Sequence, residues 1–382
     1  VMPSGSKILE RGLQPLMIDL SSDTVTKPTQ PMLAAMMVAP VGDDQRQEDP
    51  TVNALQDKIA RLLGKEAALF LPSATMANEI ALKVHTQPGD EAIVERSCHF
   101  VTSEAGGPAF LSGVMLHMIE GTRGIFTPQQ VEAGIRRSDM HCPPTRVVCV
   151  EQTSNRGGGS VWPLDALRGV AEIASKHKLG THMDGSRLMN AVVASGIPAH
   201  EHARGYDTVT FCLTKGLGCP IGALLAGNRD LIHQARRYKH LFGGAMRQAG
   251  IVAAAGLYAL DHNVERLRDD HANAALLAKR IAGIRNIRID ADHVETNLVY
   301  FDVAPTGLSG QKFVTRLMAQ GVRVMSSAGP TLIRAVTHLD LSRDDAEEAA
   351  RIIAEVTEAA SDRSRSAPPP VGAGTGHDLA IE

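Results

Sequence analysis

The sequence predicts an α/β fold with a mainly parallel sheet, followed by a smaller α+β domain, and three observations support this prediction. Short apolar runs alternate with amphipathic helical patterns through the first part of the chain, which is typical of a parallel sheet with crossover helices. A nearly continuous helical pattern then covers residues 246–284. After it, shorter strand and helix patterns follow one another. A chain of 382 residues is long enough for two such domains.

Six short runs rich in apolar and β-branched residues are the predicted strands of the sheet: residues 67–71, 91–95, 146–152, 180–184, 207–213 and 222–227. Residues 50–64 and 164–178 place apolar side chains on one helical face. The first of these two helices ends at Gly64, a typical C-cap residue. These elements build the larger domain, which we expect to span residues 18–265.

The second part, residues 266–360, continues with predicted strands at 297–303, 322–327 and 331–339 and a helix at 310–321. A final helix begins at Ser342, with Asp345 three residues on as a capping box. We expect residues 1–17 to be an N-terminal extension. The Pro/Gly/Ser-rich residues 361–382 are predicted to be disordered.

The composition excludes several function classes. The formal charge is −3 with mixed signs, and one Trp and four Tyr offer few stacking platforms, so we expect no nucleic-acid partner. Because no apolar stretch approaches the roughly 20 residues that span a bilayer, we expect no membrane partner. Five cysteines without a zinc or disulfide spacing predict reduced thiols, a cytoplasmic location and no metal site.

Several polar side chains follow predicted strands, where α/β sheets bind ligands. Asp184 and then Arg187 follow one strand, and Lys215 follows the next. The turn LPSATMAN (71–78) leads into a helix whose N-terminus favours an anion. Each feature has a simpler explanation. Lys215 could pack its stem with its amine in water, and Ser or Thr caps helices that bind nothing.

Taken together, a lysine, a carboxylate and a phosphate cradle are what pyridoxal phosphate requires. The lysine amine condenses with the aldehyde of this cofactor. A carboxylate such as Asp184 keeps the ring nitrogen protonated, which makes the ring a stronger electron sink. The sequence therefore predicts pyridoxal 5'-phosphate as the cofactor, with Lys215 as its covalent partner.

Eight ordered motifs make the sequence similar to a known family. They are IDLSSDTVTKPT (18–29), VGDD with EDPTVNAL (41–44 and 48–55), LPSATMAN (71–78), HFVTSEAGG (99–107), HMDGSRLMNAVVA (182–194), FCLTKGLGCPIG (211–222), GGAMRQAG (243–250) and LIRAVTHLDLS (332–342). On these motifs the chain resembles the L-threonine aldolases among the fold type I pyridoxal-phosphate enzymes. The resemblance implies a seven-stranded, mainly parallel sheet of the aspartate-aminotransferase type and covers residues 17–355.

The resemblance also implies roles for individual residues. Lys215 would hold the cofactor, Asp184 would contact its ring nitrogen, and His99 would stack on its ring. The other implied cofactor-binding residues are Ala74, Thr75, Arg187, Thr214 and Arg247, and the implied substrate-binding residues are Ser22, Arg187, Arg334 and Ser154. Arginines suit a substrate carboxylate because the guanidinium offers a bidentate fork.

The implied reaction is cleavage of L-threonine, L-allo-threonine or a related β-hydroxy-α-amino acid to glycine and an aldehyde. His99 and Glu104 are the candidates for the proton transfers, directly or through water. A carboxylate at Glu104 could instead serve only as a helix-start residue. The resemblance implies a homotetramer, a dimer of dimers with active sites shared between subunits.

Two departures from the family pattern leave the substrate open. Ser154 stands where the family commonly has histidine, and Arg46-Gln47 stands where it commonly has a tyrosine-glycine pair. Arg46 could favour an acidic substrate side chain, or could simply pair with Asp43 or Asp44. A β-eliminating lyase, or an aldolase for a bulkier or acidic substrate, is therefore the alternative. A non-catalytic binding protein is disfavoured, because Lys215 and the residues implied to bind the substrate carboxylate are all present.

Overall fold

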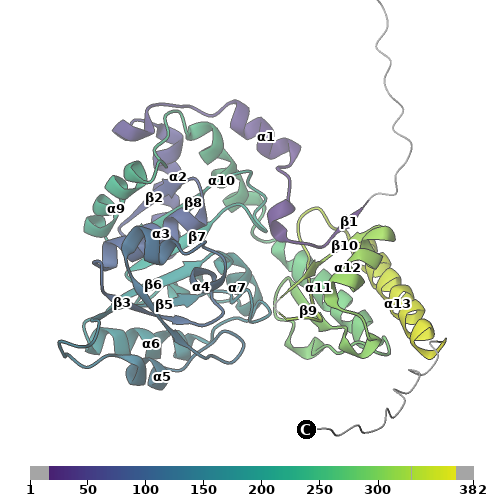
Figure 1. Cartoon of the computed structure of the whole chain (residues 1–382). Helices are drawn as coiled ribbons and strands as arrows, with labels where there is room; N and C mark the ends of the chain where they lie inside the picture. The colour runs from purple at the N-terminus through teal and green to yellow at the C-terminus, as the bar shows by residue number, and fades with distance from the viewer. Residues whose placement is uncertain (1–16, 328, 367–382) are drawn as a thin grey trace, which may run out of the picture.

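The computed structural model describes residues 17–327 and 329–366 and contains a seven-stranded sheet (Figure 1). The strand order is β2-β8-β7-β6-β5-β3-β4. The bounds are β2 (Ala67–Leu71), β8 (Ala223–Gly227), β7 (Thr208–Cys212), β6 (Gly180–Gly185), β5 (Thr145–Glu151), β3 (Glu91–Glu95) and β4 (Met115–Ile119). Only β8 runs antiparallel to its neighbours. The predicted α/β fold with a mainly parallel sheet is confirmed.

Most residues of the central strands are buried, because helices cover both faces of the sheet. Every residue of β3, β7 and β8 is buried, as is typical of parallel sheets. The helices around the seven-stranded sheet are α1 (Gln30–Met37), α2 (Pro50–Leu63), α3 (Ala74–His85), α4 (His99–Thr102), α5 (Pro128–Gly134), α6 (Leu164–Lys176), α7 (Leu188–Ser195), α8 (Ala199–His202), α9 (Arg229–Leu241) and α10 (Gly250–His262). The predicted end of α2 is confirmed, since Gly64 caps it at φ +62°.

Strand β4 was not predicted from the sequence. It is an edge strand that pairs only with β3 among the described strands. Met115 and Met118 on β4 are each 55% exposed. This exposed edge strand lacks the buried β-branched run that marks the central strands.

The nearly continuous helical pattern over 246–284 does not form one helix. The chain forms α10 and then α11 (Leu267–Ala282), with a break between them. Asn263 ends α10, and its buried side-chain amide donates a hydrogen bond to the Leu217 carbonyl at 2.8 Å. Arg266, also in the break, donates to the Gly216 carbonyl at 3.2 Å. These long-range contacts outweigh the local helical pattern, because Asn favours a helix terminus over a helix interior.

The C-terminal part contains a three-stranded antiparallel sheet in the order β11-β12-β9. Its elements are β9 (Leu298–Asp302), α12 (Gly310–Ala319), β10 (Val322–Arg323), β11 (Met325–Ser326), β12 (Leu332–Val336) and α13 (Arg343–Ser366). The predicted strand 322–327 is thus two short strands, because β10 leaves this sheet and pairs with β1 (Ile18–Asp19). The capping box is confirmed, since Ser342 Oγ accepts from Asp345 N and Asp345 Oδ2 accepts from Ser342 N.

The two largest of the four hydrophobic clusters among the described residues follow this arrangement. One surrounds the seven-stranded sheet and includes Leu267. The other joins α11, α12 and α13 to the C-terminal strands and also receives Leu20 from the N-terminal segment. The division of the chain at 265/266 stays a prediction.

The predicted disordered tail is wrong for its first residues. Helix α13 continues through 361–366, and the rest of that segment, 367–382, lies outside the described residues. So does most of the predicted N-terminal extension, residues 1–16. Among the described residues, we find no helix with the length and apolar character needed to cross a membrane.

Candidate active site

The candidate site lies at the carboxyl ends of β5, β6 and β7. Glu151, the last residue of β5, is paired in register with Asp184 on β6, and Asp184 with Thr210 on β7. Strand β7 ends two residues before Thr214, and Lys215 follows in the next turn. Parallel strands therefore bring two carboxylates and one amine to a single edge of the sheet.

Asp184 is a buried carboxylate held in place by two hydrogen bonds. The Ser186 N–H donates to its Oδ1 at 3.0 Å, and the Asn78 amide donates to its Oδ2 at 2.9 Å. Burial by itself would raise the pKa of Asp184, but the charges of Lys215 and His99 and these hydrogen bonds lower it overall. The side chain is therefore a fixed anion, which suits a protonated ring nitrogen.

Asn78 on α3 is a site residue that was not identified as one from the sequence. Its amide nitrogen donates to Glu104 Oε1 at 2.8 Å as well as to Asp184. Its carbonyl oxygen lies 3.2 Å from Nε2 of the buried His182. One amide thus fixes the relative positions of both carboxylates.

His99 and Glu104 form a close pair beside Asp184. The Nδ1 atom of His99 lies 2.6 Å from Glu104 Oε1; the His99 side chain is 30% exposed, whereas that of Glu104 is fully buried. Burial would lower the pKa of His99, but the hydrogen bond to Glu104 and the nearby charge of Asp184 raise it overall. One ring nitrogen of His99 and one carboxylate oxygen each of Glu104 and Asp184 all lie within 4.8 Å of one another. The structure thus brings these three sequence-predicted residues together.

Glu151 is a second residue that the sequence argument missed, although it ends a strand as Asp184 nearly does. It accepts from the His99 backbone N–H at 2.7 Å and from the Asn155 N–H at 2.6 Å. Burial and the charge of Asp184 raise the pKa of Glu151 to about 7. It ties the start of α4 to the loop that follows β5.

Lys215 lies in a turn that long-range contacts fix in place. The Thr26 hydroxyl donates to the Lys215 carbonyl at 3.0 Å, and Asn263 and Arg266 bind the next two carbonyls. The Lys215 side chain lines a small cavity together with Arg187. Thr214, partly exposed, has its hydroxyl 3.4 Å from Cys212 Sγ.

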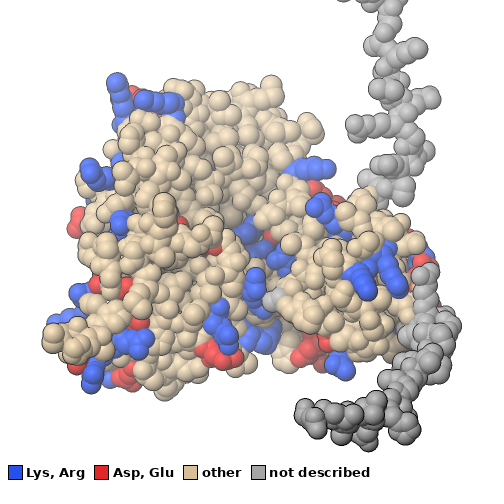
Figure 2. Space-filling view, in the orientation of Figure 1, with Lys and Arg blue, Asp and Glu red and all other residues tan. Residues whose placement is uncertain are grey.

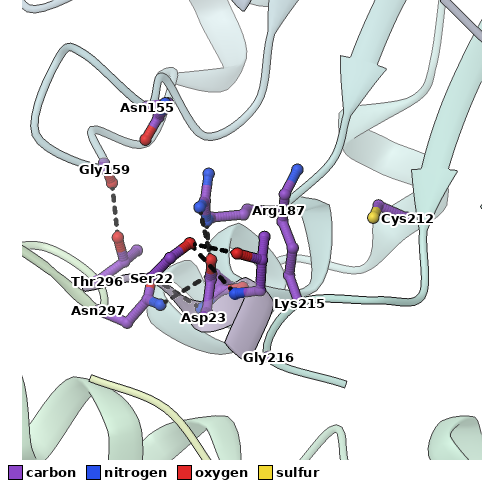
Figure 3. A network of polar contacts seen from close by, with 12 residues as sticks. Ser22, Asp23, Asn155, Gly159, Arg187, Cys212, Lys215, Gly216, Thr296 and Asn297 are labelled. Atoms are coloured by element: carbon purple, nitrogen blue, oxygen red, sulfur yellow. Dashed lines mark hydrogen bonds and ion pairs between the residues drawn. The ribbon is translucent and has the colours of Figure 1, made fainter. Parts of the chain in front are cut away.

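Arg187 is held by Asp23, which sequence reasoning also missed (Figure 3). Its Nε and Nη2 atoms donate to the two carboxylate oxygens of Asp23, each at 2.7 Å, and both side chains are buried. Asn297 donates to the same carboxylate at 3.2 Å. Burial opposes the charge on each group, but the pairing holds the pKa of Asp23 well below its usual range and raises that of Arg187.

Arg334 reaches the same N-terminal segment from β12. Its Nη2 donates to the Ser21 carbonyl at 3.0 Å, and its Nη1 donates to Asn155 Oδ1 at 3.3 Å. Its buried Nε has no hydrogen-bond partner among the described residues. Ser22 lies between Ser21 and Asp23, so one short segment connects both predicted carboxylate-binding arginines.

The anion cradle is predicted at the N-terminus of α3. Ser73 caps the helix by accepting from the Met76 N–H at 3.2 Å. Ala74 and Thr75 follow as its first residues and are partly exposed. The first N–H groups of a helix have no partners inside it, so these two can bind a phosphate.

Three sequence-predicted residues have other contacts. The buried Ser154 hydroxyl accepts from Gly157 N at 3.3 Å and faces Gly124, while the next residue, Asn155, binds Arg334. Arg247 is 60% exposed and donates to Asp43 at 2.8 Å. Arg46 lies 3.9 Å from the same Asp43 carboxylate, and its side chain is 74% exposed. None of these contacts involves Lys215, and the roles of the three residues stay predictions.

Comparisons with known proteins agree with this geometry. The family model for beta-eliminating lyases matches residues 19–304. The chain is 44% identical to the low specificity L-threonine aldolase of Escherichia coli (strain K12), over 87% of this chain and 97% of that protein. In solved structures, the fold is similar to a threonine aldolase from Leishmania major, with TM-score 0.75, 18% identity and coverage of 89% of this chain and 99% of that one.

A more distant likeness extends to another enzyme of the same fold. The serine palmitoyltransferase of Sphingomonas wittichii matches with TM-score 0.72 and 14% identity, covering 91% of this chain and 88% of that one. The structural likenesses establish the fold, and the family match and the Escherichia coli relative establish the family. The chain belongs to the beta-eliminating lyase family.

Proposed function

We propose that this protein binds pyridoxal 5'-phosphate and cleaves L-threonine, L-allo-threonine and related β-hydroxy-α-amino acids to glycine and an aldehyde. The observation that carries the proposal is the placement of Lys215 and the ionised Asp184 at adjacent strand ends, beside His99 and Glu104. The 44% identical relative named low specificity L-threonine aldolase supports the same reaction.

The described residues fit this cofactor. Lys215 supplies the amine, Asp184 the buried anion for a protonated ring nitrogen, and Ala74 and Thr75 the helix N-terminus for a phosphate. Figure 2 shows Lys and Arg side chains gathered in the hollow between the two parts of the molecule. Such a positive hollow favours a ligand that carries phosphate and carboxylate groups. When bound, the cofactor would supply an electron sink for the pair left on Cα.

The arginines would set the direction of the bond that breaks. Arg187 cannot turn freely, because Asp23 holds two of its nitrogens. Arg334 and Ser22 adjoin it through the segment 21–23. Binding of the substrate carboxylate by this fixed group restricts rotation about the bond between Cα and the amino nitrogen, so the scissile Cα–Cβ bond is presented in one orientation.

His99 would accept the proton of the β-hydroxyl group, directly or through a water molecule. Glu104 binds its Nδ1, which leaves Nε2 to accept a proton. Asn78 and Glu104 fix the ring relative to Asp184. Glu104 would therefore serve the reaction by keeping His99 in its orientation and favouring the positive charge that His99 gains.

The alternative is β-elimination or cleavage of a bulkier or acidic substrate. The description of the matching family supports β-elimination, and the exposed, weakly paired Arg46 supports an acidic substrate. A panel of β-hydroxy-α-amino acids separates the two: the aldolase releases glycine and acetaldehyde from L-threonine. A β-eliminating lyase would instead release ammonia and a keto acid from L-serine, and that result without glycine would overturn the proposal.

We also propose that the protein works as a cytoplasmic homotetramer whose active sites are shared between subunits. Large apolar side chains are exposed on the surface, among them Phe110 at 89%, Met37 at 86% and Val38 at 80%. Exposed apolar groups of this kind mark protein contacts when they gather in patches. Figure 2 shows a broad uncharged surface on the upper side of the larger part.

A neighbouring subunit could bring Arg247 or the Arg46 segment to the site. The solution mass measured by light scattering tests this, and a monomer would contradict it.

A further inference from the structure

Glu79 is a buried acid that the mechanism above does not use. It follows Asn78 on α3 and is only 2% exposed. Neither of its carboxyl oxygens has a hydrogen-bond donor among the described residues, and the same holds for Oε2 of Glu104. A buried carboxylate with no donor is costly, so these three oxygens require an explanation.

The carboxyl groups of Glu79 and Glu104 lie within hydrogen-bonding reach of each other. The turn after Glu104 closes over them: Ala105 and Gly106 have φ of +54° and +78°. A Cβ atom on Gly107 would lie 2.2 Å from Glu79 Oε1. The backbone of this turn therefore confines Glu79 against Glu104.

The surrounding charges decide which carboxyl carries a proton. Glu104 Oε1 already receives the Asn78 amide and faces His99 Nδ1, and both contacts favour the ionised form of Glu104. Glu79 has no such contacts. Burial and the neighbouring Glu104 raise the pKa of Glu79 to about 9. Two adjacent buried carboxyls cannot both ionise near neutral pH.

We propose that Glu79 is a neutral acid that donates a hydrogen bond to Glu104 Oε2 and thereby holds Glu104 ionised and oriented towards His99. Glu79 is thus a positioning residue that acts on His99 through Glu104. The effect of Glu79 on catalysis rests on the proposed function, whereas the protonation of Glu79 does not.

The titratable groups facing this pair come from several elements. Glu104 follows α4 and His99 begins it, while His182 and Asp184 lie on β6. Burial lowers the pKa of His182 to about 3, so it is neutral there. Glu151 on β5 and Lys215 act on the pair through His99 and Asp184.

The protonation is tested by infrared difference spectroscopy, with and without cofactor. The pH is set above the pKa of Glu151 and of Asp270, each raised to about 7, and below the pKa of Glu79, raised to about 9. In this range Glu79 is the buried acid that keeps its proton. Wild type minus Glu79→Gln should show the carbonyl band of a protonated carboxylic acid. The control is Glu91→Gln, because Glu91 is equally buried but is paired with Arg136. A carboxylate band alone for Glu79 would overturn the proposal, whatever the substrate is.

The positioning role is tested by the pH profile of kcat/KM. Glu79→Gln keeps a hydrogen-bond donor to Glu104, whereas Glu79→Leu removes it. Without the donor, the negative charge of Glu104 falls more fully on the oxygen that faces His99 and holds the His99 proton more firmly, so in Glu79→Leu the acid limb moves to higher pH and kcat falls roughly tenfold or more. Glu79→Gln should keep the wild-type acid limb. Equal activity in the two variants, with no shift of the limb in Glu79→Leu, would show that the donor has no effect and would overturn the positioning role.

Discussion

At the scale of single residues, hydrogen bonds to buried carboxylates determine the chemistry of the site. Asp184 stays ionised because Lys215, His99 and its donors outweigh the effect of burial. His99 has a raised pKa because Glu104 and Asp184 outweigh burial. The two residues therefore hold opposite charges more readily than they would apart. Such opposed environments are typical of acid–base sites.

Replacing Glu104 by Gln should lower the pKa of His99. The substitution removes the negative charge and changes the hydrogen bond at Nδ1, so the protonated ring loses its main stabilising contact. Because neutral His99 acts as the base, the acid limb of kcat/KM should move to lower pH, while kcat itself falls. The His99 ring signals followed by NMR against pH measure the shift directly. An unchanged or higher pKa would contradict the assigned pairing.

At the scale of elements, helix ends and breaks position the site. The start of α3 offers N–H groups, and the same helix supplies Asn78 and Glu79 one turn later. The break between α10 and α11 supplies Asn263 and Arg266, which bind the carbonyls of the Lys215 turn. The local pattern predicts helix through this break, because the partners that end the helix lie almost fifty residues away.

The α3 cradle can be tested with one substitution that spares the fold. Ala74→Pro removes a single N–H group at the first helical position, where proline is tolerated. The preceding Ser73 is extended, with φ −148° and ψ 156°, as a residue before proline should be. We expect the affinity for pyridoxal phosphate to fall about tenfold, as for a lost hydrogen bond to a charged group.

The matched control for this substitution is Ala74→Gly, which keeps the N–H group and should bind the cofactor as the wild type does. Titration of each apoprotein with the cofactor, followed by absorbance, gives both affinities. Equal affinity in Ala74→Pro and Ala74→Gly would show that this N–H group does not contact the phosphate.

At the scale of the whole molecule, the N-terminal segment joins the two parts of the chain. Strand β1 pairs with β10 in the C-terminal part, and Leu20 enters the core there. A few residues on, Asp23 binds Arg187 at the start of α7 in the larger part. The N-terminal segment thus runs from one part to the other (Figure 1), and its ion pair couples the site to their arrangement.

Replacing Asp23 by Asn should destabilise the protein by about 3–5 kcal/mol near neutral pH, because it leaves the buried Arg187 unpaired. Since the pKa of Asp23 is lowered on folding, its contribution is present above the ordinary value of 3.8. It is lost as pH falls through the lower folded value. The difference between wild type and variant should therefore shrink in acid. Denaturant unfolding at several pH values measures it.

The exposed Asp57 on α2 provides the control. Asp57→Asn should change the free energy of unfolding by less than about 0.5 kcal/mol, as expected for a surface substitution. If Asp23→Asn behaved like Asp57→Asn at every pH, the buried ion pair would not hold the segment.

Sequence patterns located six of the seven strands of the large sheet, and with them Asp184 and Lys215, because a buried strand is a local apolar run. Glu151 could have been found by the same rule, since it also ends a strand. Asn78 and Glu79 could not, because their role depends on which face of α3 packs against the sheet. The pairing of Asp23 with Arg187 spans 164 positions, and nothing in either local sequence specifies it.

The most direct test of the account is the position of the covalent link to the cofactor. The purified protein, supplied with pyridoxal 5'-phosphate, is reduced with borohydride and digested, and the labelled peptide is identified by mass spectrometry. We predict that the label is on Lys215 and that Lys215→Ala shows neither label nor glycine formation from L-threonine. A label on another lysine, or none in the wild type, would contradict the account.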